Sequence, residues 1–261
     1  MTGFVGNCAI ALTIVGSALA QGKWYPEVLN DGTPAGELLN VSGTQIYQSY
    51  PALYSKNSTP AVLFVTDIYG LPLLQNKLLA DSIAKAGYLV VLPDLFKGDA
   101  IPVQTPEGGL NLTAWRLRHS TDEIDSIIAS TIKYIQTDLG AKKIGGVGYC
   151  FGGKYVPRFL AEGKGLDAGF IAHPSGLETA EIQAIAHPIT IAAGELDTAF
   201  NVTGRHAAES ILQTKNATYQ LNLYSGAPHG FAVRPDLSVP RQKYAKETAF
   251  FQAVRWFDAW L

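Results

Sequence analysis

Three side chains that together support nucleophilic catalysis occur along the chain in the order Cys150, Asp197 and His229. Cys150 is the centre of a G-x-C-x-G motif at 148–152, which follows an apolar run at 143–147 and precedes a predicted helix. Small residues in this pattern are typical of a nucleophile elbow, the tight strand-to-helix turn that exposes a reactive side chain. The free N–H groups at a helix N-terminus also favour a thiolate over a thiol. We therefore interpret Cys150 as a nucleophile rather than as a small buried hydrophobic residue.

The acid and the base that such a nucleophile needs follow it in the sequence. Asp197 comes just after the apolar run 189–193, and we prefer it to Glu195 as the acid that orients the base. His229 follows the last predicted strand, on a loop that can return over the sheet. The order nucleophile, acid, histidine is that of α/β hydrolases. The other histidines are interpreted as structural or surface residues, His173 lying near the pocket mouth: His119, His173, His187 and His206.

Predicted strands and helices alternate from residue 61 onward, which is typical of a mostly parallel sheet covered by helices on both faces. A pair of short strands is predicted between 36 and 50. Hydrophobic patterns then predict strands at 61–66, 88–92, 143–147, 168–172, 189–193 and 218–223. They predict helices at 74–86, 115–137, 151–161, 178–184, 204–214 and 241–261. We therefore expect a single α/β domain over residues 21–261.

The composition argues against several classes of partner. The chain of 261 residues carries 20 Lys and Arg against 22 Asp and Glu without a basic run, so nothing in it predicts binding to nucleic acid or to an anionic membrane. Its two cysteines cannot form a disulfide framework, and no CxxC pair or HExxH helix offers metal ligands. We expect a monomer that acts on a small molecule and holds no metal.

The first 20 residues are typical of a secretory signal peptide. They are apolar from Phe4 to Ala20 and end in an A-x-A cleavage pattern, although the first few positions carry no Lys or Arg. An uncleaved apolar tail is the alternative interpretation. The chain also has five N-x-[ST] sequons, candidate glycosylation sites that favour a secreted protein, at Asn40, Asn57, Asn111, Asn201 and Asn216.

Four motifs together resemble those of the dienelactone hydrolase family. They are Gly32-Thr-Pro-Ala-Gly36, Asp67-Ile-Tyr-Gly70, the elbow with its second glycine at 153, and His229-Gly-Phe231, and the resemblance spans residues 32–261. It implies a three-layer α/β-hydrolase fold with a mostly parallel central sheet and no cofactor. It also implies a Cys-His-Asp triad that cleaves a lactone or carboxylic ester through a thioester acyl-enzyme.

The same resemblance assigns roles to further residues. The amides of Ile68 and Phe151 are expected to form the oxyanion hole, in keeping with the rule that one donor follows the nucleophile directly. Asp67 occupies the position of the family's active-site glutamate, which helps to control ionisation of the thiol, but its side chain is one methylene shorter. Familiar bacterial members hold the substrate carboxylate with an arginine four residues after the histidine, whereas Arg234 here is fifth. Arg234 is therefore either a clamp for a substrate anion or a surface partner of Asp236.

Three other functions stay open at this stage. An acyltransferase or a non-catalytic secreted binding protein could use the same scaffold, because a fold alone does not establish an activity. The G-x-G-x-x-x-G spacing at 146–152 is also similar to a dinucleotide-binding turn. That reading needs an acidic residue at the end of the following strand, and Asp167 precedes the strand 168–172 instead.

Overall fold

The computed structural model describes residues 26–104 and 109–261, so the predicted signal peptide lies outside the described residues. Its centre is an eight-stranded sheet with the order β1-β2-β4-β3-β5-β6-β7-β8. All pairs from β4 to β8 are parallel, and β1 and β2 add an antiparallel hairpin at one edge. The strands are β1 (Glu37–Val41), β2 (Thr44–Ser49), β3 (Ala61–Val65), β4 (Leu89–Pro93), β5 (Ile144–Tyr149), β6 (Ala168–Ala172), β7 (Ile189–Gly194) and β8 (Tyr219–Tyr224).

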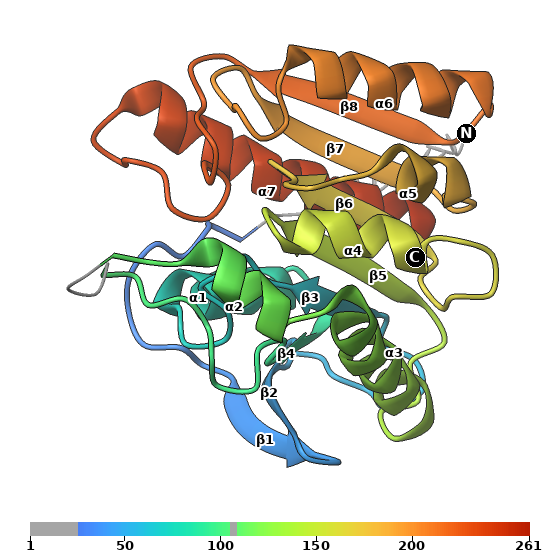
Figure 1. Ribbon diagram of the computed structural model, residues 1–261. Helices are drawn as coiled ribbons and strands as arrows, with labels where there is room; N and C mark the ends of the chain where they lie inside the picture. Colours follow the sequence, from blue (N-terminus) through green and yellow to red (C-terminus); the bar gives the residue numbers. More distant parts are fainter. Residues whose placement is uncertain (1–25, 105–108) are drawn as a thin grey trace, which may run out of the picture.

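Helices cover both faces of this sheet, which makes three layers (Figure 1). Helices α1 (Leu74–Lys85) and α7 (Pro240–Trp260) pack on one face, where α7 runs behind the sheet in Figure 1. The opposite face carries α2 (Leu112–Arg118), α3 (Thr121–Thr137), α4 (Gly152–Phe159), α5 (Thr179–Ala184) and α6 (Val202–Thr214). The expected α/β fold with a mostly parallel sheet is confirmed.

The central strand β3 shows why the apolar runs in the sequence become buried strands. All five of its residues are buried. Val62 and Phe64 belong to the hydrophobic core on the α7 side, whereas Ala61, Leu63 and Val65 belong to the core on the α3 side. Successive side chains of a strand point to opposite faces, so a strand covered on both faces must be apolar at every position.

The helix predicted over 115–137 is divided in the structure, and that prediction is wrong at the break. Helix α2 ends at Arg118, and α3 begins at Thr121. Ser120 adopts an extended conformation, and its hydroxyl accepts a hydrogen bond from the backbone N–H of Glu123 at 3.2 Å, which is an N-cap. The hydrophobic period continues across the break, so periodicity alone did not show it. The Ser-x-x-Glu spacing at 120–123 was the available signal.

The parallel strands bring distant segments of the chain to one edge of the sheet. Asp67 follows β3, Cys150 follows β5, Asp197 follows β7 and His229 follows β8. Because these strands are parallel, their carboxyl ends meet at the same edge, where open α/β sheets bind their ligands. None of the helices in the described residues is long and apolar enough to cross a membrane.

Candidate active site

Cys150 adopts the unusual backbone conformation of a nucleophile elbow. Its φ is +51°, in the left-handed region that residues other than glycine seldom enter. A Cβ on Gly148 would lie 2.4 Å from the carbonyl oxygen of Gly152, and a Cβ on Gly152 would lie 2.1 Å from that of Val65. No real side chain tolerates such contacts with backbone, so the turn that presents Cys150 requires glycine at both flanking positions.

The elbow brings the Cys150 thiol to the imidazole of His229. The sulfur lies 3.0 Å from Nε2 of His229, and Nδ1 of the same ring lies 2.9 and 3.0 Å from the two carboxylate oxygens of Asp197. An ionised carboxylate only accepts hydrogen bonds, so Nδ1 donates to Asp197 and Nε2 faces the sulfur. The structure thus brings together the three side chains that the sequence pattern singled out, although 79 positions separate Cys150 from His229.

Burial and hydrogen bonding determine the charges of this group. Burial raises the pKa of Asp197, but hydrogen bonds from His229 and from the amides of Ala199 and Phe200 outweigh it, so the pKa is lowered overall. Burial also opposes protonation of His229, yet its bonds to Asp197 and Cys150 raise the pKa of the imidazole to about 10. The ring is therefore protonated at neutral pH, with Nε2 facing the sulfur of Cys150.

Glu195, the alternative to Asp197 as the orienting acid, contacts a neighbouring loop and not the imidazole. It accepts hydrogen bonds from the hydroxyl of Ser225 at 2.9 Å and from the amide of Gly226 at 2.7 Å. These bonds tie the loop after β7 to the loop after β8, which carries His229. Glu195 thus positions a loop, and Asp197 is the carboxylate that meets the imidazole.

The sequence profile of the dienelactone hydrolase family matches residues 49–261, a segment that contains Cys150, Asp197 and His229. This chain belongs to the dienelactone hydrolase family. It is accordingly an enzyme that hydrolyses esters or lactones, with the α/β fold of that family.

Curated relatives and solved structures agree with this membership. The chain is 43% identical over 233 residues to the hydrolase pyvD of Aspergillus violaceofuscus, a match that covers 89% of this chain and 94% of that protein. It is 31% identical over 238 residues to dienlactone hydrolase 1 of Gibberella moniliformis, covering 88% and 90% of the two chains. The crystal structure of a dienelactone hydrolase from Anabaena variabilis has the same fold, with a TM-score of 0.63 at 17% identity, covering 87% of this chain and 97% of that one.

The two amides expected to form the oxyanion hole belong to neighbouring loops. Ile68 lies in the loop after β3, and Phe151 follows the nucleophile. The N–H of Gly152 donates to the carbonyl oxygen of Thr66 at 3.0 Å, which joins the elbow to that loop. Within the described parts of the chain, the backbone hydrogen bonds leave both amides without a protein acceptor. They are thus available to a negatively charged oxygen, and their role in catalysis stays a prediction.

Asp67, expected at the position of the family's glutamate, forms its hydrogen bonds with groups other than the thiol. Its side chain is 1% exposed, and it accepts hydrogen bonds at 3.1 Å from the amide of Tyr69 and from Nδ2 of Asn76. Burial raises the pKa of this carboxyl, against the lowering effect of Asn76 and Arg234. In the described residues its partners do not include Cys150. The contact between Asn76 and Asp67 was not predicted from the sequence. The one signal for it is that Asn76 is a polar residue on the buried face of α1.

Arg234 pairs with Asp67 rather than with Asp236. Its Nε lies 3.3 Å from a carboxylate oxygen of Asp67, and its guanidinium lies over the ring of Tyr69, 4.1 Å from the ring centroid. Asp236 instead accepts hydrogen bonds from the amide and the hydroxyl of Ser238. Despite the sequence offset of one position, Arg234 therefore lies beside Asp67 of the loop after β3, and its contact with a substrate anion stays a prediction.

The loop after β6 forms another wall of the site. His173 is fully buried with a φ of +38°, and its ring meets that of His229 edge to face at a centroid distance of 5.2 Å. Burial and the neighbouring His229 lower the pKa of His173 to about 3, so this ring is neutral. Ser175 places its hydroxyl 3.5 Å from the sulfur of Cys150. The sequence predicted this loop at the pocket mouth. In the structure it lies closer to the thiol than that prediction implies.

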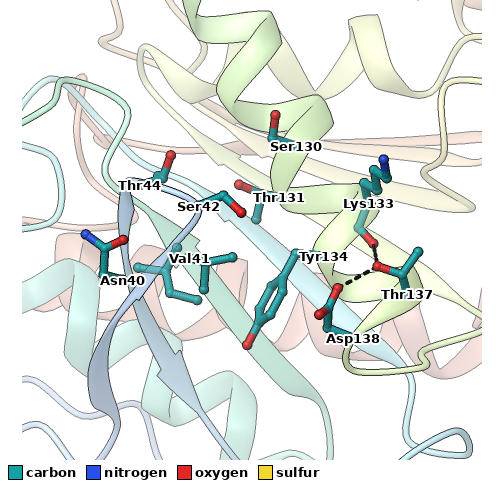
Figure 2. A pocket seen from close by; sticks show the side chains of 11 residues that line it. Asn40, Val41, Ser42, Thr44, Ser130, Thr131, Lys133, Tyr134, Thr137 and Asp138 are labelled. Carbon is teal, nitrogen blue, oxygen red and sulfur yellow. Dashed lines mark hydrogen bonds between the residues drawn. The ribbon is translucent and has the colours of Figure 1, made fainter.

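A separate hollow of about 540 Å³ lies between the β1–β2 hairpin and α3 (Figure 2). Its lining is rich in hydroxyl groups, and the Thr137 hydroxyl lies within hydrogen-bond distance of the Lys133 carbonyl and the Asp138 carboxylate. Its lining includes no residue of the triad and none that hydrogen-bonds to one, so it is not part of the catalytic site. Among the described residues, no group of three or more His, Cys, Asp or Glu is arranged to hold a metal ion.

All five sequon asparagines lie on the surface. Asn40, Asn111 and Asn201 each accept a hydrogen bond through Oδ1 from the backbone N–H three residues later, at distances of 2.9 to 3.0 Å. A glycan is attached to the amide nitrogen, which these bonds do not use. The geometry therefore permits attachment, and glycosylation stays a prediction.

Proposed function

We propose that this protein cleaves a carboxylic ester or lactone through a triad of Cys150, His229 and Asp197, with a thioester intermediate. The observation that supports this most strongly is the 3.0 Å separation between the sulfur and Nε2 of His229, whose other nitrogen faces a buried carboxylate. A nucleophile, a base and an orienting acid within hydrogen-bond reach of one another are the parts that covalent acyl transfer needs.

In the first half-reaction the thiolate of Cys150 attacks the carbonyl carbon and forms a carbon–sulfur bond. The carbonyl electrons move to the oxygen, which accepts hydrogen bonds from the amides of Ile68 and Phe151. The intermediate then collapses, the carbon–oxygen bond to the leaving group breaks, and the protonated Nε2 of His229 gives its proton to the departing alkoxide. In a lactone that alkoxide remains attached to the acyl group, so the ring opens without loss of a fragment.

In the second half-reaction, neutral His229 takes a proton from water. The resulting hydroxide attacks the thioester carbon, and the carbon–sulfur bond breaks. The products are the carboxylic acid, the alcohol and the original pair of thiolate and imidazolium. Asp197 holds the ring in the tautomer that both steps require.

The direct test replaces Cys150 with Ala and measures hydrolysis of 4-nitrophenyl acetate and of simple lactones. We expect a loss of about 10³-fold or more in kcat, because the triad acts as one unit. When the wild-type reaction is quenched during turnover, we expect mass spectrometry to show an acylated peptide that contains Cys150. A folded Cys150→Ala variant with wild-type turnover would overturn the proposal.

Two controls separate hydrolysis from the other functions of this scaffold. An alcohol added to the assay distinguishes hydrolysis from acyl transfer, since a hydrolase releases mainly the free acid. Treatment with iodoacetamide, which alkylates the thiol, is expected to abolish turnover. A protein that turns over no ester, with or without the alkylation, would instead fit a binding role.

The proposed function also assigns a contact to Arg234. A guanidinium has five N–H donors, and the bond to Asp67 accounts for one of them, so the others can hold a carboxylate of the substrate. The Arg234→Gln substitution is expected to raise KM for an ester that carries a carboxylate, while KM for its neutral methyl ester stays unchanged. Equal effects on the two substrates would contradict this assignment.

We propose, finally, that the protein is secreted and glycosylated. The apolar segment 1–20 with its A-x-A ending and the five exposed sequons support this. When the full chain is expressed in yeast, we expect the protein in the culture medium to begin at Gln21. We also expect this protein to lose mass on treatment with an N-glycosidase. Retention inside the cells with an intact Met1 would contradict it.

A further inference from the structure

A pocket of about 410 Å³ lies beside the elbow, between α2, the start of α3 and the loop after β6. Two of its lining residues belong to the catalytic site: Phe151, which follows the nucleophile, and Ser175, whose hydroxyl lies 3.5 Å from the sulfur of Cys150. The pocket therefore adjoins the nucleophile through these two residues, and no residue of the triad itself lines it. Its volume falls in the range of about 300–1,000 Å³ that is usual for small-molecule sites.

The inner wall of this pocket carries the rings of Phe151 and Tyr155, whose centroids lie 4.9 Å apart. Buried rings support Phe151 from behind, since its centroid lies 5.3 Å from that of Phe96 and 6.0 Å from that of Trp115. Aromatic rings attract one another in offset and edge-on arrangements at centroid distances of about 4.5–7 Å. A flat ring that enters the pocket can meet Phe151 in the same geometry.

The side of the pocket that faces solvent carries one apolar residue among charged ones. Leu117 lines the pocket and is 82% exposed, and Arg116, Lys154 and Glu178 line it as well. Apolar area is stabilised when a ligand removes it from water. Leu117 and the exposed part of Phe151 thus offer apolar area to a planar group.

The position of the pocket indicates which part of the substrate it holds. During acylation the leaving group takes a proton from His229, so its oxygen must face the loops after β7 and β8. All residues that line the pocket lie between 116 and 178, and none belongs to those two loops. The two loops that face the leaving group therefore take no part in the pocket, which leaves it to the acyl group that stays attached to the sulfur.

We propose that this pocket is the acyl-binding pocket and that the preferred acyl group is aromatic. The proposal rests on the proposed function, because an acyl group exists only if Cys150 attacks a carbonyl. It goes further in naming the chemical class of the substrate and the residues that select it.

The test compares vinyl benzoate with vinyl acetate, which release the same leaving group and differ only in the acyl part. The Thr121→Trp substitution places a large side chain at the first residue of α3, which lines the pocket. It is expected to lower kcat/KM for vinyl benzoate by about tenfold or more, while kcat/KM for vinyl acetate stays within about twofold. The matched control is Thr179→Trp at the first residue of α5, outside the pocket, which is expected to leave both values unchanged.

A second variant tests the same proposal if Thr121→Trp does not fold. Leu117→Asp changes an exposed residue, so the core is not disturbed, and it replaces an apolar side chain of the pocket by a charge. We expect KM for vinyl benzoate to rise by about tenfold with little change for vinyl acetate. The corresponding control is Leu53→Asp, at a residue that is 91% exposed and lies outside the pocket.

The outcomes distinguish this proposal from the one on which it rests. Parallel losses for both esters in folded variants, or unchanged ratios, would overturn the acyl-pocket assignment and leave the triad intact. Wild-type rates for both esters in Cys150→Ala would overturn the proposed function, and the acyl pocket with it.

Discussion

The close approach of Gly152 to strand β3 makes its replacement by alanine a sharp test of the elbow. A Cβ at this position would lie 2.1 Å from the carbonyl oxygen of Val65 and 2.9 Å from that of Thr66, whereas real Cβ atoms hardly ever approach closer than 3.0 Å. The elbow and the end of β3 must therefore move apart by about 0.9 Å. Both contacts are with backbone, so no side-chain rotation can relieve them. We expect Gly152→Ala to destabilise the fold by about 1–3 kcal/mol, as overpacked cores do.

The same movement reaches the catalytic groups. Gly152 donates its N–H to the carbonyl oxygen of Thr66, Phe151 precedes it, and Ile68 lies two residues beyond Thr66. An oxyanion hole needs donors within about 2.7–3.1 Å of the oxygen. Because misplacement by 1 Å can cost about 10²-fold in rate, we expect kcat/KM of Gly152→Ala to fall by about that factor. Urea unfolding followed by circular dichroism measures the stability, and hydrolysis of 4-nitrophenyl acetate measures the rate.

Gly204→Ala is the matched control for this substitution. Gly204 lies in α6 without a positive φ, and its nearest neighbour would be 3.7 Å from an added Cβ. Alanine is favoured over glycine inside a helix, so this change is expected to stabilise the protein by up to about 1 kcal/mol with unchanged activity. A Gly152→Ala variant with the stability and kcat/KM of the wild type would refute the packing argument.

Three further predictions concern charge. Asp197→Asn is expected to lower kcat by about 10⁴-fold, because an amide does not hold the required imidazole tautomer, and the pH–rate profile is expected to show a lower pKa for His229. The pKa of His229 is raised from 6.5 to about 10, so the stability that its charge contributes is complete below pH 6.5 and is lost as the pH rises through about 10. Urea unfolding of the wild type and of His229→Gln across this range measures that loss. Arg234→Gln is expected to destabilise the fold by about 1–3 kcal/mol at neutral pH, because the buried carboxyl of Asp67 loses a charged hydrogen-bond donor. The loss is expected to be smaller in acid, where Asp67 is protonated, and unfolding at both pH values measures the difference.

Each of these predictions has a result that contradicts it. Asp197→Asn should lose far more activity than Glu195→Gln, since Glu195 contacts a loop and not the imidazole; equal losses would remove Asp197 from the triad. A stability difference between wild type and His229→Gln that does not change with pH would show that the charge is not coupled to folding. The exposed Arg255 on α7 gives a control for Arg234, and equal effects of Arg255→Gln and Arg234→Gln would exclude a specific pair with Asp67.

Much of the site could be predicted because its parts are encoded locally. The apolar runs of β3 and β5 are continuous since both faces of the sheet are covered, and the glycines around Cys150 stand where backbone meets backbone. The break between α2 and α3 was predicted wrongly, because the hydrophobic period persists across it and the cap at Ser120 is a local hydrogen bond that interrupts the helix.

By itself the sequence determined the order of strands and helices, the elbow at Cys150 and the succession of Cys150, Asp197 and His229. These follow from local patterns and from the chain order that the fold imposes. Only the tertiary structure decided the partner of Asp67, which is Arg234, 167 positions away, and not the thiol. It alone also decided that the rings of Phe151 and Tyr155 line the pocket beside Cys150. The physical reason is that such contacts depend on the direction in which side chains leave distant elements, and no local pattern records that direction.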